Sequence, residues 1–214
     1  MIQRIELEGV VPHVFTEGCP CSEVWLQSLT LERGRLYLIE ASSGAGKSSL
    51  CSFIYGHRSD YMGRIAFDGQ DIRAIQPERW SQIRRESLGL LFQELKLFDN
   101  LSVWENIQIK NQLTQQHSPE KIVHLLTRLG IGDKIDQPTG KLSLGQQQRV
   151  ALIRMLMQPL DFIMLDEPIS HLDDANASTV AEIILAEAQR QGAAIICTSV
   201  GKALPLPYHH IYHL

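Results

Sequence analysis

The sequence has few cysteines and lacks a long apolar run. Its four cysteines, Cys19, Cys21, Cys51 and Cys197, are too few and too scattered for a disulfide framework. Cys19 and Cys21 form at most half of a metal site, so we interpret them as reduced thiols in a loop. No stretch approaches the roughly 18 consecutive apolar residues of a membrane-spanning helix, and Met1–Val10 lacks the apolar core of a signal peptide. These absences favour a cytoplasmic protein that would act at a membrane only through a partner.

An excess of basic residues is also missing. Lys and Arg number 20 against 24 Asp and Glu, which gives a net charge of −4. This balance argues against nucleic acid as the main partner, because binding to a phosphate backbone depends on clustered positive charge. No internal repeat is evident. With 214 residues, 44% of them hydrophobic, the chain has the composition of a globular protein with a sizeable core.

Short apolar runs alternate with helical patterns along the chain. The strand-like stretches are residues 2–7, 24–31, 36–39, 63–69, 162–165 and 194–197. Helical spacing of apolar residues follows Lys47 and Ser118, continues through Val150, Ile153 and Met157, and returns over 180–187. Strands that alternate with helices predict an α/β core with a mainly parallel sheet. The helical middle, residues 95–158, is interpreted as an insertion into that core.

A glycine-rich loop lies between a predicted strand and a predicted helix. We call residues 41–48 the phosphate loop; they read Ala41-Ser42-Ser43-Gly44-Ala45-Gly46-Lys47-Ser48. In such a loop the backbone N–H groups and the helix N-terminus face phosphates, a lysine reaches the β- and γ-phosphates, and the hydroxyl after it ligates Mg²⁺. Here Lys47 and Ser48 take those places. An ordinary Gly- and Ser-rich turn is the alternative.

Two carboxylates, Asp166 and Glu167, directly follow the buried run at 162–165. Ligands of open α/β sheets bind at the carboxyl ends of strands. Asp166 is therefore a candidate to hold Mg²⁺ through its water shell, and Glu167 is a candidate general base for an attacking water. The pair is a weak signal alone and a strong one together with the phosphate loop.

A third segment, Leu142–Arg149, places Ser143 and Gly145 just before a predicted helix. The hydroxyl and the free N–H groups there are suited to an anion. From these residues alone, an ordinary serine N-cap is the simpler interpretation.

Taken in their order and spacing, these three motifs resemble those of ABC transporter ATP-binding subunits. Gln93 matches the Q-loop of that family, residues 170–173 its D-loop, and residues 98–106 the lipoprotein-release, macrolide-export and cell-division subgroup. The resemblance implies one domain over residues 1–214. Its P-loop NTPase core would comprise 1–94 and 159–214, with an N-terminal antiparallel β portion, and 95–158 would form the helical subdomain.

The resemblance also implies a function: binding and hydrolysis of ATP with Mg²⁺. Two copies, as a homodimer or a heterodimer, would stack head to tail around ATP and drive a separate membrane permease from the cytoplasmic face. Glu167, Gln93 and Ser199 would be catalytic, and Ser48, Gln93 and Asp166 would hold the metal. The residues expected to contact nucleotide are Phe15, Ser42, Ser43, Gly44, Ala45, Gly46, Lys47, Ser48, Ser49, Ser143, Gly145, Gln146 and Asp173. Asp173 would link the two sites, and Phe15 would stack on adenine unless it is a core residue.

The sequence departs from the family pattern at three positions. Ala41 replaces a glycine at little steric cost, whereas Leu144 replaces a glycine where a partner's nucleotide would approach. Ser199 stands where the family has a histidine, and a serine hydroxyl cannot relay a proton at neutral pH. We therefore expect slow hydrolysis. The alternative is a hydrolysis-deficient, ATP-gated regulatory or assembly module; a soluble ABC ATPase acting on nucleic acid is opposed by the net charge.

Overall fold

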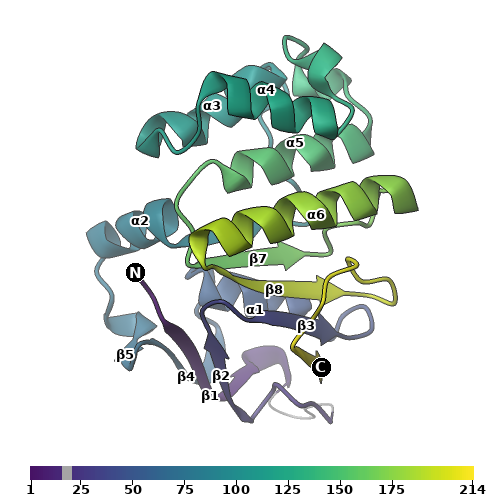
Figure 1. The fold of residues 1–214 in the computed structure, drawn as a ribbon. Helices are drawn as coiled ribbons and strands as arrows, with labels where there is room; N and C mark the ends of the chain where they lie inside the picture. Colours follow the sequence, from purple (N-terminus) through teal and green to yellow (C-terminus); the bar gives the residue numbers. More distant parts are fainter. Residues whose placement is uncertain (16–20) are drawn as a thin grey trace.

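The structure is a computed structural model that describes residues 1–15 and 21–214. Within these residues, nine strands form two sheets (Figure 1).

Cys19 lies outside the described residues, so the interpretation of Cys19 and Cys21 as loop thiols stays a prediction. Burial raises the pKa of Cys51, and it raises that of Cys197 to about 11, so both thiols stay protonated at neutral pH.

The larger sheet has five strands in the order β6-β7-β8-β3-β9, and every neighbouring pair is parallel. Its strands are β3 (Leu36–Glu40), β6 (Leu88–Leu91), β7 (Phe162–Asp166), β8 (Ala194–Ser199) and β9 (His210–His213). Because all five strands run the same way, their carboxyl ends lie at one edge (Figure 1). The prediction of a mainly parallel sheet is confirmed.

The second sheet is antiparallel and has the order β2-β1-β4-β5. Its strands are β1 (Arg4–Pro12), β2 (Ser28–Glu32), β4 (Tyr61–Phe67) and β5 (Gln70–Asp71). Three predicted strands were wrong in their bounds. The stretch 2–7 corresponds to β1, which begins at Arg4 and continues to Pro12. The stretch 24–31 is a strand only from Ser28, because the Ser22 hydroxyl accepts the N–H groups of Val24 and Trp25 and holds a turn there. The stretch 63–69 ends as a strand at Phe67, since residues 68 and 69 turn with positive φ.

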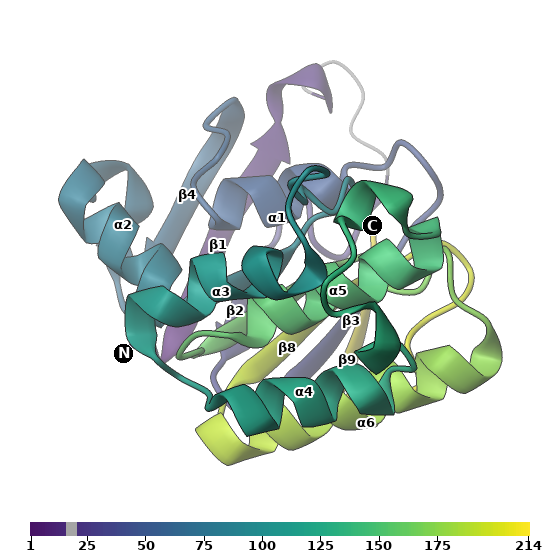
Figure 2. The ribbon, with the colours of Figure 1, turned by 90° about the horizontal axis from the view of Figure 1, so that it is seen from above.

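Helices cover the parallel sheet on both faces. They are α1 (Lys47–Ile54), α2 (Pro77–Glu86), α3 (Val103–Thr114), α4 (Pro119–Arg128), α5 (Leu144–Leu156) and α6 (Asp174–Gln191), with short 3₁₀ turns at His13–Phe15, Ile72–Ala74, Gly132–Lys134 and Thr139–Lys141. One core packs α1 and the antiparallel sheet against one face, and a second packs α3 to α6 against the other. In Figure 2, α4 lies along α6, to which the Arg128–Glu182 ion pair joins it. The parallel sheet is therefore buried on both faces, as its apolar strands require.

Local signals explain where the predicted helices begin and end. The helix expected after Ser118 is α4: the Ser118 hydroxyl caps it, and Gly130 follows its end with φ +65°. The helices α3, α4 and α5 lie within the stretch 95–158 that predicted a helical insertion, although residues 95–102 are not helical. The proposed division into core and helical subdomain stays a prediction.

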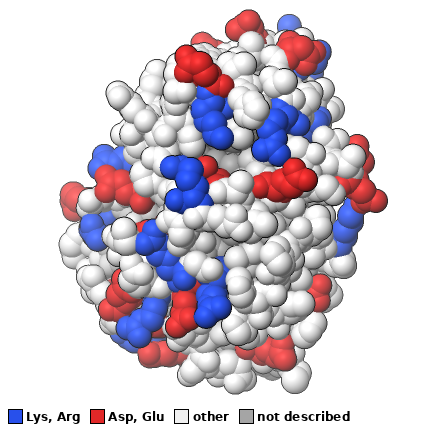
Figure 3. Space-filling view, viewed as in Figure 1, with Lys and Arg blue, Asp and Glu red and all other residues white. Residues whose placement is uncertain are grey.

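The outer surface has two properties that bear on partners. None of the helices in the described part of the chain combines the length and the apolar character needed to cross a bilayer. On the face seen in Figure 3, basic and acidic side chains are interspersed. The charge on that face is therefore mixed and is not gathered into one patch.

Candidate functional site

The phosphate loop connects the end of β3 to the start of α1. Gly44 and Gly46 have φ of +83° and +99°, a left-handed conformation that glycine adopts without strain. A side chain at Gly46 is also excluded by packing, because its Cβ would lie 2.9 Å from the Trp25 ring and 3.2 Å from the Phe15 ring. Ser42 and Ser43 are exposed in the loop, and the hydroxyl of Ser49, in the first turn of α1, accepts a hydrogen bond from Arg58.

Lys47 is the first residue of α1; its side chain reaches back to the start of the loop, and the residue is 4% exposed. Its Nζ donates to the carbonyl oxygens of Ser42, at 2.9 Å, and Ala41, at 3.3 Å. The same nitrogen lies 3.7 Å from Oε1 of Glu167. The ammonium group is therefore satisfied by carbonyl dipoles and a carboxylate, and a phosphate would take the place of these acceptors.

Asp166 and Glu167 lie at the carboxyl end of β7, next to the phosphate loop, as predicted. Asp166 is 5% exposed and pairs with Thr198 of β8 across the parallel ladder. Glu167 comes directly after the strand and has φ +50°, which is unusual for a residue other than glycine. The 3.7 Å approach of its carboxylate to Lys47 joins the phosphate loop and the acidic pair in one site.

The three candidate metal ligands, Ser48, Gln93 and Asp166, line one cavity of about 440 Å³. The Ser48 hydroxyl donates to Oε1 of Gln93 at 3.5 Å. These groups offer hydroxyl, amide and carboxylate oxygens, which are the ligands that Mg²⁺ prefers. His57 borders the same cavity; its pKa is lowered by burial and by Arg84 and Lys96, so the imidazole stays neutral at neutral pH.

Ser199, the third predicted catalytic residue, is brought beside Glu167. The two residues line a cavity of about 360 Å³. The Ser199 carbonyl accepts the N–H of Ala41, so the end of β8 supports the start of the phosphate loop. Its hydroxyl is buried and has no hydrogen-bond partner among the described residues.

A second group of predicted residues lies at helix starts. Ser143 is the N-cap of α5: its hydroxyl accepts the Gln146 N–H, and the Gln146 side chain accepts the Ser143 N–H. Asp173 is the N-cap of α6: its carboxylate accepts hydrogen bonds from the backbone N–H and the side-chain amide of Asn176, and these lower its pKa. Among the described residues, no hydrogen bond or ion pair joins Ser143, Gly145, Gln146 or Asp173 to the phosphate loop.

Packing within the chain restricts position 145 to glycine. A Cβ there would lie 2.7 Å from the carbonyl oxygen of His171, which is backbone and cannot give way easily. The neighbouring Leu144 is 49% exposed, so its side chain creates no crowding inside the chain. Whether Leu144 obstructs a partner's nucleotide stays a prediction.

Phe15 and Trp25 lie beneath the phosphate loop. Phe15 is half-buried against the core formed with the antiparallel sheet, and it also contacts Gly46. Its role as an adenine-stacking residue stays a prediction. Trp25 is 1% exposed, and its indole N–H donates to the carbonyl of Ala45 at 3.0 Å.

Three residues that shape the site escaped sequence reasoning. They are Trp25, which holds Ala45; Thr198, whose hydroxyl contacts both Asp166 and Glu167; and Gln148, whose amide donates to the Glu167 carbonyl. Thr198 directly follows the predicted strand 194–197, but its place beside Asp166 depends on the order and register of the strands, which the sequence analysis did not predict. No sequence pattern singles out Trp25 or Gln148.

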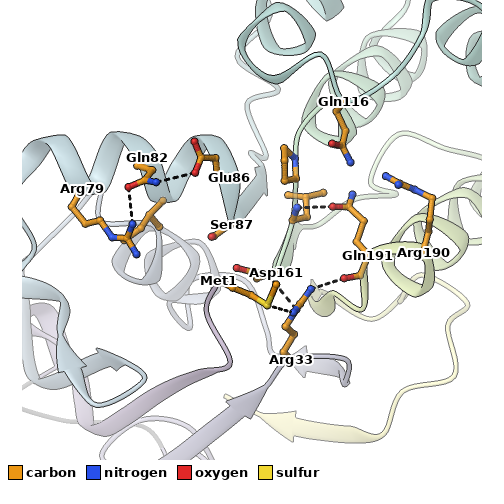
Figure 4. A pocket seen from close by; sticks show the side chains of 13 residues that line it. Met1, Arg33, Arg79, Gln82, Glu86, Ser87, Gln116, Asp161, Arg190 and Gln191 are labelled. Carbon is orange, nitrogen blue, oxygen red and sulfur yellow. Dashed lines mark hydrogen bonds and ion pairs between the residues drawn. The ribbon is translucent and has the colours of Figure 1, made fainter.

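The largest of the cavities described for this chain, about 520 Å³, lies elsewhere (Figure 4). Ser87, Asp161 and Arg33 place it at the amino ends of β6, β7 and β3, opposite the phosphate loop. Arg33 lies between Asp161, 3.3 Å away, and the Gln191 carbonyl, 2.6 Å away. The Arg33–Asp161 ion pair thus borders the cavity, and none of the predicted site residues lines it.

Comparison with known proteins gives a consistent result. A family model described as ABC transporter matches residues 27–170. The macrolide export ATP-binding/permease protein MacB of Hyphomonas neptunium is 35% identical over 172 residues, which cover 79% of this chain and 26% of that protein. The ABC transporter ATP-binding protein YtrE of Bacillus subtilis is 32% identical over 160 residues, covering 73% of this chain and 69% of YtrE. The chain thus spans about a quarter of the length of the MacB relative.

Solved structures with low sequence identity share the fold. The dimeric structure of MJ0796, a bacterial ABC transporter cassette, superposes with a TM-score of 0.76 at 22% identity and covers 91% of this chain and 87% of MJ0796. A structure of the same cassette in a post-hydrolysis state bound to ADP and Pi gives a TM-score of 0.75 at 21% identity, covering 92% and 88%. The predicted fold class is confirmed.

Proposed function

The chain belongs to the ABC transporter family, and from this premise we propose that it binds and hydrolyses ATP to drive a membrane permease. One observation carries the proposal. The phosphate loop follows β3, and Asp166 and Glu167 lie at the end of β7, at the same edge of the sheet. Lys47 of the loop lies 3.7 Å from the Glu167 carboxylate. Phosphate binding and activation of water can therefore take place in one site.

In this proposal Lys47 and the loop N–H groups bind the β- and γ-phosphates. Ser48, Gln93 and Asp166 would hold Mg²⁺, and their shared cavity and oxygen atoms fit that ion. When bound, Mg²⁺ supplies positive charge that offsets the negative charge of the phosphate oxygens. Glu167 orients and deprotonates the attacking water.

Ser199 sets the rate in this proposal. Its side chain lies beside Glu167 but offers a short, uncharged hydroxyl in place of an imidazole. Loss of one contact that stabilises the transition state costs about 10²–10³ in rate. We therefore propose slow hydrolysis that still depends on Glu167.

The proposed assembly is a head-to-tail dimer with a permease. In it, Ser143, Gly145 and Gln146 of one copy complete the nucleotide site of the other, with Asp173 at the interface and Phe15 on the adenine. The exposed start of α5 and the dimeric form of the related cassette MJ0796 support this arrangement. The names of the MacB relatives, which join an ATP-binding and a permease function, support a permease as the partner and the cytoplasmic face of a membrane as the location.

The test is steady-state hydrolysis of MgATP by the purified protein beside its Glu167→Gln variant. A matched control is Glu182→Gln, an identical change at a carboxylate that is 70% exposed on α6. We expect slow turnover in the wild type and in the control, and none in Glu167→Gln. Tight ATP binding without Glu167-dependent turnover would instead support the ATP-gated module, and absence of ATP binding would overturn both.

A further inference from the structure

Thr198 holds the two acidic residues of the site through a single hydroxyl. It is fully buried at the end of β8, beside Asp166 in the parallel ladder. Its Oγ1 donates to Oδ1 of Asp166 at 2.8 Å and accepts the N–H of Glu167 at 3.2 Å. A threonine hydroxyl has one hydrogen to donate, and here that hydrogen goes to Asp166.

The carboxylate of Asp166 depends on this bond for its orientation. Asp166 is 5% exposed, and Thr198 provides the only hydrogen bond that its carboxylate receives from the residues the structure describes. A buried carboxylate turns toward the donor available to it, because an unpaired buried charge is costly. Asp166 also lines the cavity of Ser48 and Gln93. The orientation of its carboxylate therefore determines which oxygen atom would face a metal ion in that cavity.

The backbone of Glu167 depends on the same hydroxyl. At φ +50° this residue has left the regular strand geometry, so its N–H is accepted by a side chain and not by a neighbouring strand. Such a conformation persists in a non-glycine residue only where the surroundings hold it. Thr198 holds the N–H, and Gln148 holds the carbonyl of the same residue at 3.3 Å.

We propose that Thr198 is a positioning residue that aligns the metal-facing carboxylate of Asp166 and the catalytic carboxylate of Glu167 together. The inference rests on the proposed function of this site. Thr198 takes no part in the chemistry itself, because its hydroxyl is fully buried and engaged with the two residues it positions. Removal of a group that orients a metal ligand in this way typically lowers metal affinity or activity by about 10- to 100-fold.

The test compares Thr198→Val, which removes the hydroxyl at nearly constant shape, with Thr198→Ser, which retains it. Thr179→Val is the matched control, because its hydroxyl donates within α6 itself, to the Ala175 carbonyl. Three properties are measured: kcat and KM for MgATP, the Mg²⁺ concentration that gives half-maximal ATP binding, and the hydrogen exchange rate of the Glu167 amide in the protein without nucleotide. Thermal unfolding of each variant checks that it is folded.

In Thr198→Val we expect a kcat lowered about 10- to 100-fold, an increased Mg²⁺ requirement, little change in KM, and faster exchange of the Glu167 amide. Thr198→Ser and Thr179→Val should behave like the wild type. The inference is overturned if Thr198→Val keeps its Mg²⁺ requirement and amide exchange, or if Thr198→Ser is equally impaired. A wild type that binds no MgATP overturns the proposed function itself, and one that binds but does not hydrolyse leaves the Mg²⁺ and exchange measurements to decide the role of Thr198.

Discussion

Lys47 and Glu167 face each other across 3.7 Å, with 4% and 22% of their side chains exposed. One belongs to the phosphate loop and the other follows β7, so their ion pair joins the two halves of the site. In the chain without nucleotide, the carboxylate proposed to activate water also neutralises the lysine proposed to bind phosphate. Its negative charge therefore opposes an incoming phosphate.

This relationship predicts that Glu167→Gln binds ADP about threefold to tenfold more tightly than the wild type, because one negative charge beside the phosphates is removed. Lys47→Ala should lose detectable binding. ADP is the suitable ligand, since it has no γ-phosphate to promote dimer closure, and titration calorimetry gives the affinity. Glu182→Gln should bind ADP like the wild type. Equal affinities of Glu167→Gln and wild type would mean that the ion pair does not compete with nucleotide.

Trp25→Phe should weaken ATP binding. The change removes the indole N–H that donates to Ala45 but keeps a ring beneath Gly46. Loss of one hydrogen bond of ordinary strength predicts an affinity lower by roughly threefold to tenfold. Trp104→Phe is the control, because Trp104 packs against the core in the helical part of the chain, away from the loop. An ATP affinity in Trp25→Phe equal to that of the control would show that the loop holds its shape without the bond.

The sequence alone reveals some residues of this site and misses others, depending on the kind of contact that each residue makes. Lys47 and Asp166 are predictable because parallel strands end at one edge of the sheet. Functional side chains at the ends of two such strands are therefore brought together. Trp25 and Thr198 are not found in this way. The contact of Trp25 with Ala45 depends on how a turn before β2 folds under the loop, and that of Thr198 with Asp166 depends on the register of two strands.

The bounds of the elements show a similar limit. The stretch 24–31 alternates imperfectly in hydrophobicity and is predicted as one strand, yet the Ser22 hydroxyl accepts the N–H groups of Val24 and Trp25 and holds a turn at its start. A side chain that competes locally for backbone N–H groups overrides periodicity. Helix α4, in contrast, follows its capping serine and its terminal glycine closely, because both signals are local.

Ser199→His should raise turnover. The Ser199 hydroxyl has no hydrogen-bond partner in the described part of the chain, and the cavity of about 360 Å³ that Ser199 and Glu167 line leaves room for a ring next to Glu167. If the missing imidazole limits the rate, we expect kcat to rise by up to about 10²–10³, the loss ascribed above to the missing contact. Ser199→Leu fills the same space without a ring nitrogen and should give no increase. An increase in both variants would point to packing, and an increase in neither would mean that the side chain at this position does not limit hydrolysis.

Glu187 joins the helical part of the chain to α6. Its carboxylate is 9% exposed, lies 3.6 Å from Nε2 of His117, and accepts hydrogen bonds from Arg190 and Gln191 at 3.1 Å and 2.6 Å. Glu187→Gln should lower the free energy of unfolding at pH 7 by about 1.5–3 kcal/mol, the range for hydrogen bonds to a charged group. Glu182→Gln, which alters an exposed pair with Arg128, should change it by about 0.5 kcal/mol or less.

The contribution of Glu187 should also depend on pH in a defined direction. Burial alone would raise its pKa, but the nearby His117 ring and the hydrogen bonds from Arg190 and Gln191 outweigh burial and lower the pKa from 4.5 to about 2. Because the folded chain holds this carboxylate ionised more strongly than the unfolded chain does, the stabilisation is fully present above pH 4.5 and is lost as pH falls toward 2. Urea unfolding of the wild type and Glu187→Gln at several pH values should therefore give a stability difference that is constant between pH 5 and 7 and narrows as the pH falls further. The difference for Glu182→Gln should stay small throughout. A difference for Glu187→Gln that is equally large at pH 3 and pH 7 would mean that the side chain stabilises the chain by packing and not by its charge.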